Sequence, residues 1–347
     1  MVQSTTKNFL VLVIGLTVNI SAYVGMLDLE SSINISHNLG TISLSITYGC
    51  GLLMSLFATP LLLCNIGSKW TLILGEIGFA AFTLANFYPG LATLIPGAII
   101  GSMGESFIWP AGLLYVTCLF EHNSHTRDED ADQISEVKNI WISRYYGVIK
   151  SCVIWGNVIS YGVLYGFKQH QQSNVTQSFT DCGSNFCSAE GTNTSSYVPK
   201  NKESLYILLG SYAVLQLFSI ALHVFALKPL FQSTTLPEGA SKPSISSIII
   251  SSLRSNAYHL SSLDQILMTP ICFYYGFLIS YSLTDFTRAF VSCTLGVEQV
   301  GLILIVYGAL NTIVLVILGC LGYGVTERKR RRREKNHLPE EERIIAN

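Results

Sequence analysis

The chain has 347 residues, of which 49% are hydrophobic and only 12% are charged, and its formal net charge is −1 at pH 7. Soluble domains carry about twice that charged fraction, roughly 25%, and the mean hydropathy here is +0.42. This composition excludes an ordinary soluble domain and favours an integral membrane protein. The balanced charge gives no reason to expect a nucleic-acid partner, so the lipid bilayer is the first partner that the sequence implies.

Apolar runs of roughly 20 residues recur along the chain, each long enough to cross a bilayer core of about 30 Å as a helix. The first run resembles a secretory signal, but its apolar core is too long and no small-x-small cleavage site follows it. We therefore expect an all-α integral membrane protein with eight spans. These spans are expected at 8–29, 41–63, 70–88, 91–119, 141–167, 204–227, 265–286 and 300–324.

The distribution of Lys and Arg sets the expected orientation of the spans. Most of these residues fall on one side of the membrane when the chain is threaded through it, and the run "RKRRRR" at 328–333 lies on that side too. Because positively charged loops tend to stay in the cytoplasm, we expect both termini to be cytoplasmic and the 168–203 loop to be external. The plasma membrane is the expected location, with the endoplasmic reticulum and endosomes as alternatives.

The most hydrophilic stretch of the chain, 174–196, falls in this external loop. It contains two Asn-x-Ser/Thr triplets, at Asn174 and Asn193, and a third triplet on the same side begins at Asn34. These three asparagines are candidate glycosylation sites, because glycans are added to such triplets on the external side.

Two cysteines, Cys182 and Cys187, lie between the two triplets of that loop. We interpret them as a local disulfide, since the external side permits oxidation. The alternative is a metal or redox pair, but their spacing matches neither the usual zinc pattern nor a thioredoxin motif.

Ionisable residues inside the spans are candidate functional groups, because burying them in a membrane is costly. Glu76 in the third span and Lys150 in the fifth lie at similar depths, so their side chains could pair. Such a pair would be an ion or charge-relay site, or a salt bridge that holds two helices together, and we favour the salt bridge. Lys150 could instead extend to the inner membrane interface.

Glu105 is the first choice among the candidate site residues. It lies near the middle of the fourth span, five residues before Pro110, and a proline there can kink the helix and free a carbonyl. A polar kink at mid-membrane would suit a solute or proton site. The alternative is a protonated Glu that bonds a neighbouring helix.

Asp285 and Arg288 close the expected external end of the seventh span. They lie three residues apart on one helix face, so an intrahelical pair is the simplest interpretation, and contact with a partner protein is the alternative. His223 in the sixth span is expected to be a hydrogen-bonded helix residue. No metal site, no cofactor and no enzymatic activity are expected, since the chain contains none of the common catalytic or phosphate-binding motifs.

Several stretches, taken in order, resemble the Unc-93-like (uncoordinated-93) family of membrane proteins. They are "TLIPGAIIG" at 93–101, "VIWGNVIS" at 153–160, "DCGSNFC" at 181–187, "YILLGSY" at 206–212 and "TRAFVSCTLGVEQVG" at 287–301. The resemblance implies a fold like that of the major facilitator superfamily, with twelve spans in two six-helix bundles. On that scheme the chain holds a six-helix N-terminal half plus two helices of the second half. The implied divisions are an N-terminal bundle at 1–227, a cytoplasmic linker at 228–264, a partial second bundle at 265–324 and a basic tail at 325–347.

The resemblance also implies two classes of function. The first is an accessory or regulatory membrane protein that modulates a two-pore potassium channel or another membrane partner. The alternative is a secondary transporter of a small solute, whose site would lie between the two bundles. We favour the accessory role because the sequence holds only two spans of the second bundle. The loop "NIGSK" at 65–69 also lacks the Asp of the facilitator loop pattern, keeping only Gly67 and the basic Lys69.

Overall fold

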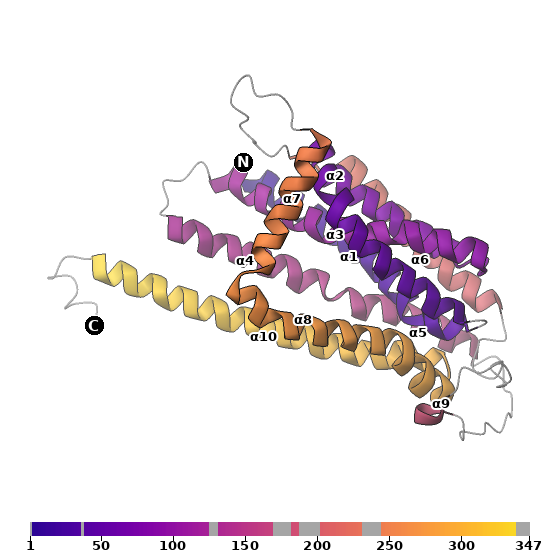
Figure 1. Cartoon of the computed structure of the whole chain (residues 1–347). Coiled ribbons are helices and arrows are strands. Elements are labelled where there is room, and N and C mark those ends of the chain that lie inside the picture. The colour runs from indigo at the N-terminus through magenta and orange to yellow at the C-terminus, as the bar shows by residue number, and fades with distance from the viewer. Residues whose placement is uncertain are drawn as a thin grey trace.

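The computed structural model describes residues 2–35, 38–124, 131–168, 182–186, 202–230 and 244–337. Every regular element in these ranges is helical, which confirms the all-α fold class. The helices form an elongated bundle in which α1 begins and α10 ends at the same end (Figure 1). The elements are α1 Val2–Ile33, α2 Leu39–Ala85, α3 Leu91–Ser124, α4 Ala131–Ile149, α5 Cys152–Lys168, η2 Gly183–Asn185, α6 Lys202–Ala226, α7 Ile245–Leu260, α8 Leu263–Tyr281, η4 Ser282–Ser292, α9 Cys293–Leu295 and α10 Glu298–His337.

Within the described ranges, seven helical stretches are long and apolar enough to cross a membrane, against the eight that the sequence predicts. The difference lies in α2, a 47-residue element that joins the second and third expected spans. Its backbone breaks at Gly67, where φ is 79° and ψ is 174°. This positive φ is readily adopted only by glycine, so the break falls where the sequence allows it.

The two halves of α2 run in opposite directions along α3. The neighbouring positions are Thr47 with Ala98 and Thr59 with Ser106 before the break, and Gly75 with Ile108 and Ala85 with Gly97 after it. The first pairs rise together along both helices, whereas the second pairs run in reverse order. The element therefore contains two antiparallel spans, and the predicted second and third spans are both present in it.

The helices differ from the expected spans and connections in three places. α3 continues to Ser124 and α4 begins at Ala131, so most of the expected 120–140 link is helical. A turn at Lys150 and Ser151 divides the fifth expected span into α4 and α5. α10 extends past the expected end of the last span and stops at His337.

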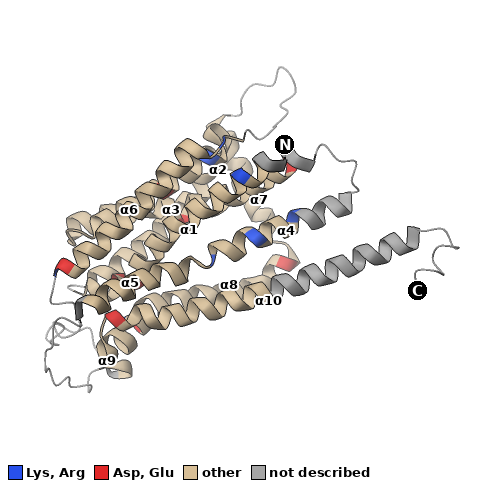
Figure 2. Ribbon diagram, turned by 180° about the vertical axis from the view of Figure 1, so that it is seen from behind, with Lys and Arg blue, Asp and Glu red and all other residues tan. Residues whose placement is uncertain are grey.

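α1 is the central helix of the bundle, packed against α2, α3, α4, α5, α6, η4 and α10. Its apolar segment is the most buried of the seven, because it is surrounded on nearly all sides. α8 is the opposite case, since none of its residues is buried. Charged residues are sparse along the helices and gather toward their ends (Figure 2).

Candidate functional site

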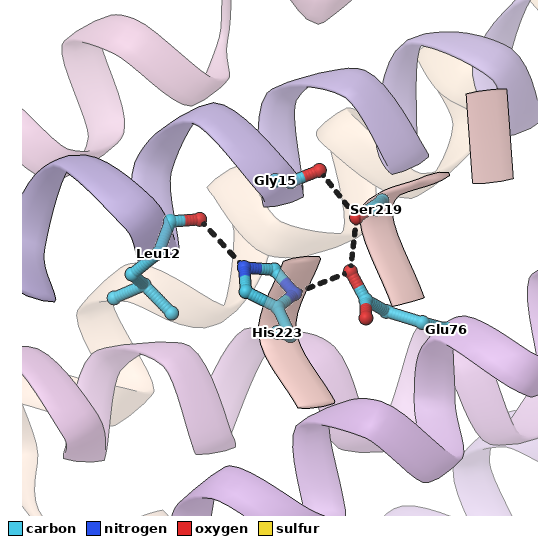
Figure 3. Close-up of polar contacts among 5 residues, drawn as sticks. All are labelled: Leu12, Gly15, Glu76, Ser219 and His223. Carbon is cyan, nitrogen blue, oxygen red and sulfur yellow. Dashed lines mark hydrogen bonds and ion pairs between the residues drawn. The ribbon is translucent and has the colours of Figure 1, made fainter. Parts of the chain in front are cut away.

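The carboxylate of Glu76 pairs with His223 and not with Lys150, so the expected Glu76–Lys150 pair was wrong. Glu76 Oε1 lies 2.8 Å from Nδ1 of His223 and 2.7 Å from Oγ of Ser219 (Figure 3). Both side chains of the Glu76–His223 pair are completely buried. The two groups meet because α2 and α6 both pack on α1, which places the face of α6 that carries His223 against Glu76.

Lys150 instead lies beside the indole of Trp109, with its ammonium 5.2 Å from the ring centroid. The indole Nε1 donates to Glu105 Oε2 at 3.3 Å. Trp109 therefore contacts an acid one turn away on α3, Glu105, and a base from another part of the chain, Lys150. Glu105 is half-buried, and its partners are Trp109 in its own helix and Tyr23 on the neighbouring α1, as the sequence alternative of a bond to a neighbouring helix expected.

Two buried acids of α1, Asp28 and Glu30, were missed by the sequence analysis. Asp28 Oδ2 accepts a hydrogen bond from Asn157 Nδ2 at 2.7 Å, and Glu30 Oε1 accepts one from Ser43 Oγ at 2.7 Å. Asp28 is 5% exposed and Glu30 is fully buried. The sequence did contain a signal for them, since two acidic residues stand at the end of an apolar run. Acidic residues at that position are easily interpreted as the solvent-exposed end of a span.

The end of the bundle that carries η4 is called here the disulfide end, because it holds a bond between Cys182 and Cys293. The expected Cys182–Cys187 bond was therefore wrong, and Cys187 lies outside the described residues. The Cα atoms of Cys182 and Cys293 are 5.7 Å apart, within the usual range for a disulfide. The segment at 182–186 packs on η4, which brings a cysteine 111 positions away within reach.

η4 is an 11-residue π-helix that docks on the end of α1. Ser31 Oγ donates to Leu283 O at 2.6 Å, and Ser292 Oγ donates to Ser32 Oγ at 2.8 Å. Long π-helices are rare, and π turns often mark functional sites. The second half of η4, at 287–292, is the beginning of the 287–301 stretch that resembles the Unc-93-like family.

Asp285 and Arg288 project from η4 but do not form the intrahelical pair that was the simplest expectation. Arg288 Nη1 donates to Asn38 Oδ1 at 2.9 Å, and its guanidinium lies 5.1 Å from the ring centroid of Phe186. Arg288 is 8% exposed, whereas Asp285 is exposed. An open hollow of about 500 Å³ lies between η4 and the start of α2. Its lining residues are Asn38, Thr41, Ile42, Ser45, Ile46, Asp285 and Arg288.

The candidate glycosylation site at Asn34 does not fit the folded chain. Its side chain is 5% exposed, and its Nδ2 donates to Asn86 Oδ1 at 2.7 Å in the protein interior. A glycan is attached through that nitrogen, so it would require this contact to open. Asn174 and Asn193 lie outside the described residues.

At the opposite end of the bundle, Lys69 follows directly on the Gly67 break. Its Nζ donates to Val224 O at 2.9 Å and to Leu227 O at 2.6 Å. Val224 is in the last turn of α6 and Leu227 directly follows the helix, a place where carbonyl groups lack intrahelical partners. The lysine therefore binds the α2 hairpin to the end of α6. Among the described residues, no group of three or more His, Cys, Asp or Glu side chains is placed to hold a metal ion.

Residues 31–332 match the family described as "Ion channel regulatory protein UNC-93". This match includes η4, the disulfide and Glu76, and it begins one residue after Glu30. The chain belongs to the UNC-93 family. The resemblance carried by the quoted stretches is thereby confirmed.

Individual relatives extend over most of the chain. It is 30% identical to "Protein unc-93 homolog A" of Xenopus laevis, over 91% of this chain and 67% of that protein. It is 29% identical to the protein of the same name in Homo sapiens, over 90% of this chain and 67% of that protein. It is 22% identical to the "Putative potassium channel regulatory protein unc-93" of Caenorhabditis elegans, over 91% of this chain and 44% of that protein.

Proposed function

We propose that this multi-pass membrane protein regulates a potassium channel or another membrane-protein partner. The family is described as ion channel regulatory, and the Caenorhabditis elegans relative is named as a putative potassium channel regulator. Both descriptions support a regulatory and non-enzymatic role. Two-pore potassium channel subunits are the partners that we propose to test first.

The observation that best supports a contact site is the position of Asp285 on η4. Arg288, one turn away, is held by Asn38 and Phe186, so this face of η4 is fixed in place. Asp285 remains exposed beside the hollow at the start of α2. A rigid, exposed carboxylate next to a concavity suits a basic or hydrogen-bonding group of a partner, so we assign the contact to this face.

The test is co-expression with two-pore potassium channel subunits, with channel currents and co-purification as the two measurements. We expect the wild-type protein to change channel open probability and Asp285→Asn to reduce that change. Asp264→Asn is the matched control, because it removes an exposed carboxylate at the other end of the bundle. Unchanged currents and no co-purification across several channels would contradict the regulatory function. If Asp285→Asn changed channel open probability as much as the wild type does, only the proposed contact site would be rejected, and the regulatory function would stand.

We further propose that both termini are cytoplasmic, at the plasma membrane. The described Lys and Arg residues lie mostly toward the end where the chain begins (Figure 2), which supports that end being cytoplasmic. The external loop would then carry glycans at Asn174 and Asn193. Peptide-N-glycosidase should increase the gel mobility of the wild type. Asn174→Gln with Asn193→Gln should abolish the increase, and Asn34→Gln should leave it unchanged. No mobility change in the wild type would count against this orientation.

Solute transport is the second candidate function, supported by the buried acids of the bundle core. Asp28, Glu30 and Glu76 each cost free energy in a membrane interior, and such residues commonly mark solute or ion pathways. For Glu105, the first-choice site residue, this hypothesis predicts that Glu105→Gln abolishes uptake in proteoliposomes. Absence of any pH- or sodium-coupled uptake by the wild type would reject it.

A further inference from the structure

One face of α6 carries polar side chains along roughly half of the depth of a bilayer core. Tyr212, Gln216, Ser219 and His223 follow one another at spacings of four, three and four residues, and all are fully buried. That spacing places them on one side of the helix. They face α1, since Ser219 Oγ donates to Gly15 O at 2.7 Å. A polar seam therefore runs between two helices in the centre of an apolar bundle.

The contacts of His223 determine where its hydrogens lie. Nε2 is 3.2 Å from the backbone carbonyl oxygen of Leu12. A carbonyl oxygen can only accept, so this contact requires the hydrogen on Nε2. Nδ1 is then left facing Glu76 Oε1 at 2.8 Å. A bare nitrogen lone pair and a carboxylate oxygen would repel at this distance, so a second hydrogen is needed between them.

The hydroxyl of Ser219 can change its hydrogen-bond partner according to whether Glu76 is protonated. Its hydroxyl lies 2.7 Å from both Gly15 O and Glu76 Oε1 (Figure 3). The hydroxyl carries one hydrogen for two acceptors. It can therefore stabilise Glu76 as a carboxylate, or turn to Gly15 when Glu76 holds the proton itself.

Further buried polar atoms extend the seam beyond the pair. Glu76 Oε2 and both side-chain polar atoms of Gln216 are buried without a hydrogen-bond partner among the described residues, as are both of Asn19 on α1. Because Gly15 lies beside Ser219, antiparallel packing brings Asn19 level with Gln216. Buried polar atoms of this kind are normally satisfied by ordered water, which also conducts protons.

The charged groups near the pair come from few elements. The helices packed against α6 are α1, α2 and α5. On α2, Lys69 lies at the end of α6, where it bonds the carbonyl oxygens of Val224 and Leu227. On α1, Lys7 is exposed, and Asp28 and Glu30 lie more than 20 Å away along the helix by its rise per residue. α5 has Lys168 at its far end only. α2 itself also packs on α3 and α7, where Glu105 bonds Trp109 and where Glu121, Arg254 and His259 are exposed.

We propose that Glu76 and His223 form a proton-binding site in the core of the helical bundle. In the loaded site one proton is shared between Nδ1 and Oε1, and the pair is neutral overall. On release, the bond to Nδ1 or Oε1 breaks and the proton passes to water, which leaves a neutral Nε2–H imidazole and a carboxylate. The attraction across the 2.8 Å contact is then replaced by repulsion, so proton occupancy controls how tightly α2 holds α6. This assignment is independent of the proposed channel regulation.

The test is nitrogen NMR of the full chain in lipid nanodiscs, with ¹⁵N label in its seven histidines. The His223 signals are identified by their loss in His223→Gln. If His223→Gln does not fold, Ser219→Ala identifies them by a local change in their chemical shifts. We expect Nδ1 of His223 to change from a protonated or hydrogen-bonded nitrogen to a free one as the pH rises. Nε2 should keep its hydrogen throughout.

The matched variant is Glu76→Gln, which keeps the shape of the side chain. Its amide can donate to Nδ1 but exchanges no proton, so we expect Nδ1 to stay hydrogen-bonded and the pH response to be lost. Two results would overturn the proposal. One is a wild-type His223 that keeps a single protonation state over the whole range in which the protein is folded. The other is an equal pH response in the wild type and in Glu76→Gln.

Discussion

Arg288 donates a hydrogen bond from Nη1 to Asn38 Oδ1 at 2.9 Å, across 250 positions of sequence. Asn38 has a left-handed backbone, with φ of 55°, immediately before α2. The same guanidinium lies over Phe186 in the 182–186 segment. One buried side chain thus joins η4, the start of α2 and the 182–186 segment of the 168–203 loop. The stability of the disulfide end should depend on it.

Arg288→Lys should lower the free energy of unfolding by about 2 kcal/mol, although the charge is kept. A lysine cannot reproduce the planar group that bonds Asn38 while it stacks on Phe186, and such bonds to charged groups contribute roughly 1.5–3 kcal/mol. Thermal unfolding in detergent measures the change. Asp285→Asn is the control and should unfold like the wild type, because Asp285 is exposed. Equal stability of all three proteins would contradict this role.

Replacing Cys182 or Cys293 by Ser should lower the free energy of unfolding by about 2–4 kcal/mol, because the bond closes a long loop in the unfolded chain. Peptide mapping by mass spectrometry without reduction should find the two cysteines linked in the wild type. Cys187→Ser should retain that link and the wild-type stability. A link between Cys182 and Cys187 in the wild type would reject the pairing.

Lys69→Met should loosen the end of the bundle opposite the disulfide, because the carbonyl groups of Val224 and Leu227 at the end of α6 lose their donor. Tyr115 also bonds this region, through Lys228 O at 2.8 Å, and the buried Cys118 lies one turn further along α3. We expect faster alkylation of Cys118 in Lys69→Met than in the wild type. The exposed Cys64 is the internal control and should react equally in both. Unchanged protection of Cys118 would show that Lys69 does not hold this end closed.

Asn157→Asp should destabilise the protein more at high pH than at low pH. Asn157 donates to Asp28 at 2.7 Å, so the variant places two buried carboxyl groups in contact. Two carboxylates repel when both are ionised, whereas a proton on one of them restores a hydrogen bond. The loss of melting temperature relative to the wild type should therefore shrink as the pH falls. A pH-independent loss would indicate that Asp28 is not the partner of this residue.

The spans could be predicted from the sequence because their signal is local. Runs of apolar residues long enough to cross a membrane leave few alternatives to a helix. The hairpin of α2 was also predictable, since Gly67 and the polar residues around it separate two such runs. The turn at Lys150 was not, because two polar residues, Lys150 and Ser151, are too short an interruption to indicate the end of a span.

The pairing of side chains could not be predicted, since it depends on which helices pack and on how each is rotated. Glu76 and Lys150 have similar depths, but depth alone does not bring two helices together. His223 met Glu76 because α6 packs on both α1 and α2. Cys182 is a second case, because the spacing of cysteines does not fix their connectivity. The nearer Cys187 was the natural choice from sequence and was wrong.

The bond between Cys182 and Cys293 turns the chain between them into a covalent ring that includes α6, α7 and α8. The chain before the α6–α7 connection and the chain after it are therefore joined covalently in two ways, by the connection itself and by the disulfide. A protease that cut once in this connection would produce two chain fragments that remain linked by the disulfide. The two fragments would separate under denaturing conditions only when the chain has been cleaved and the disulfide has been reduced.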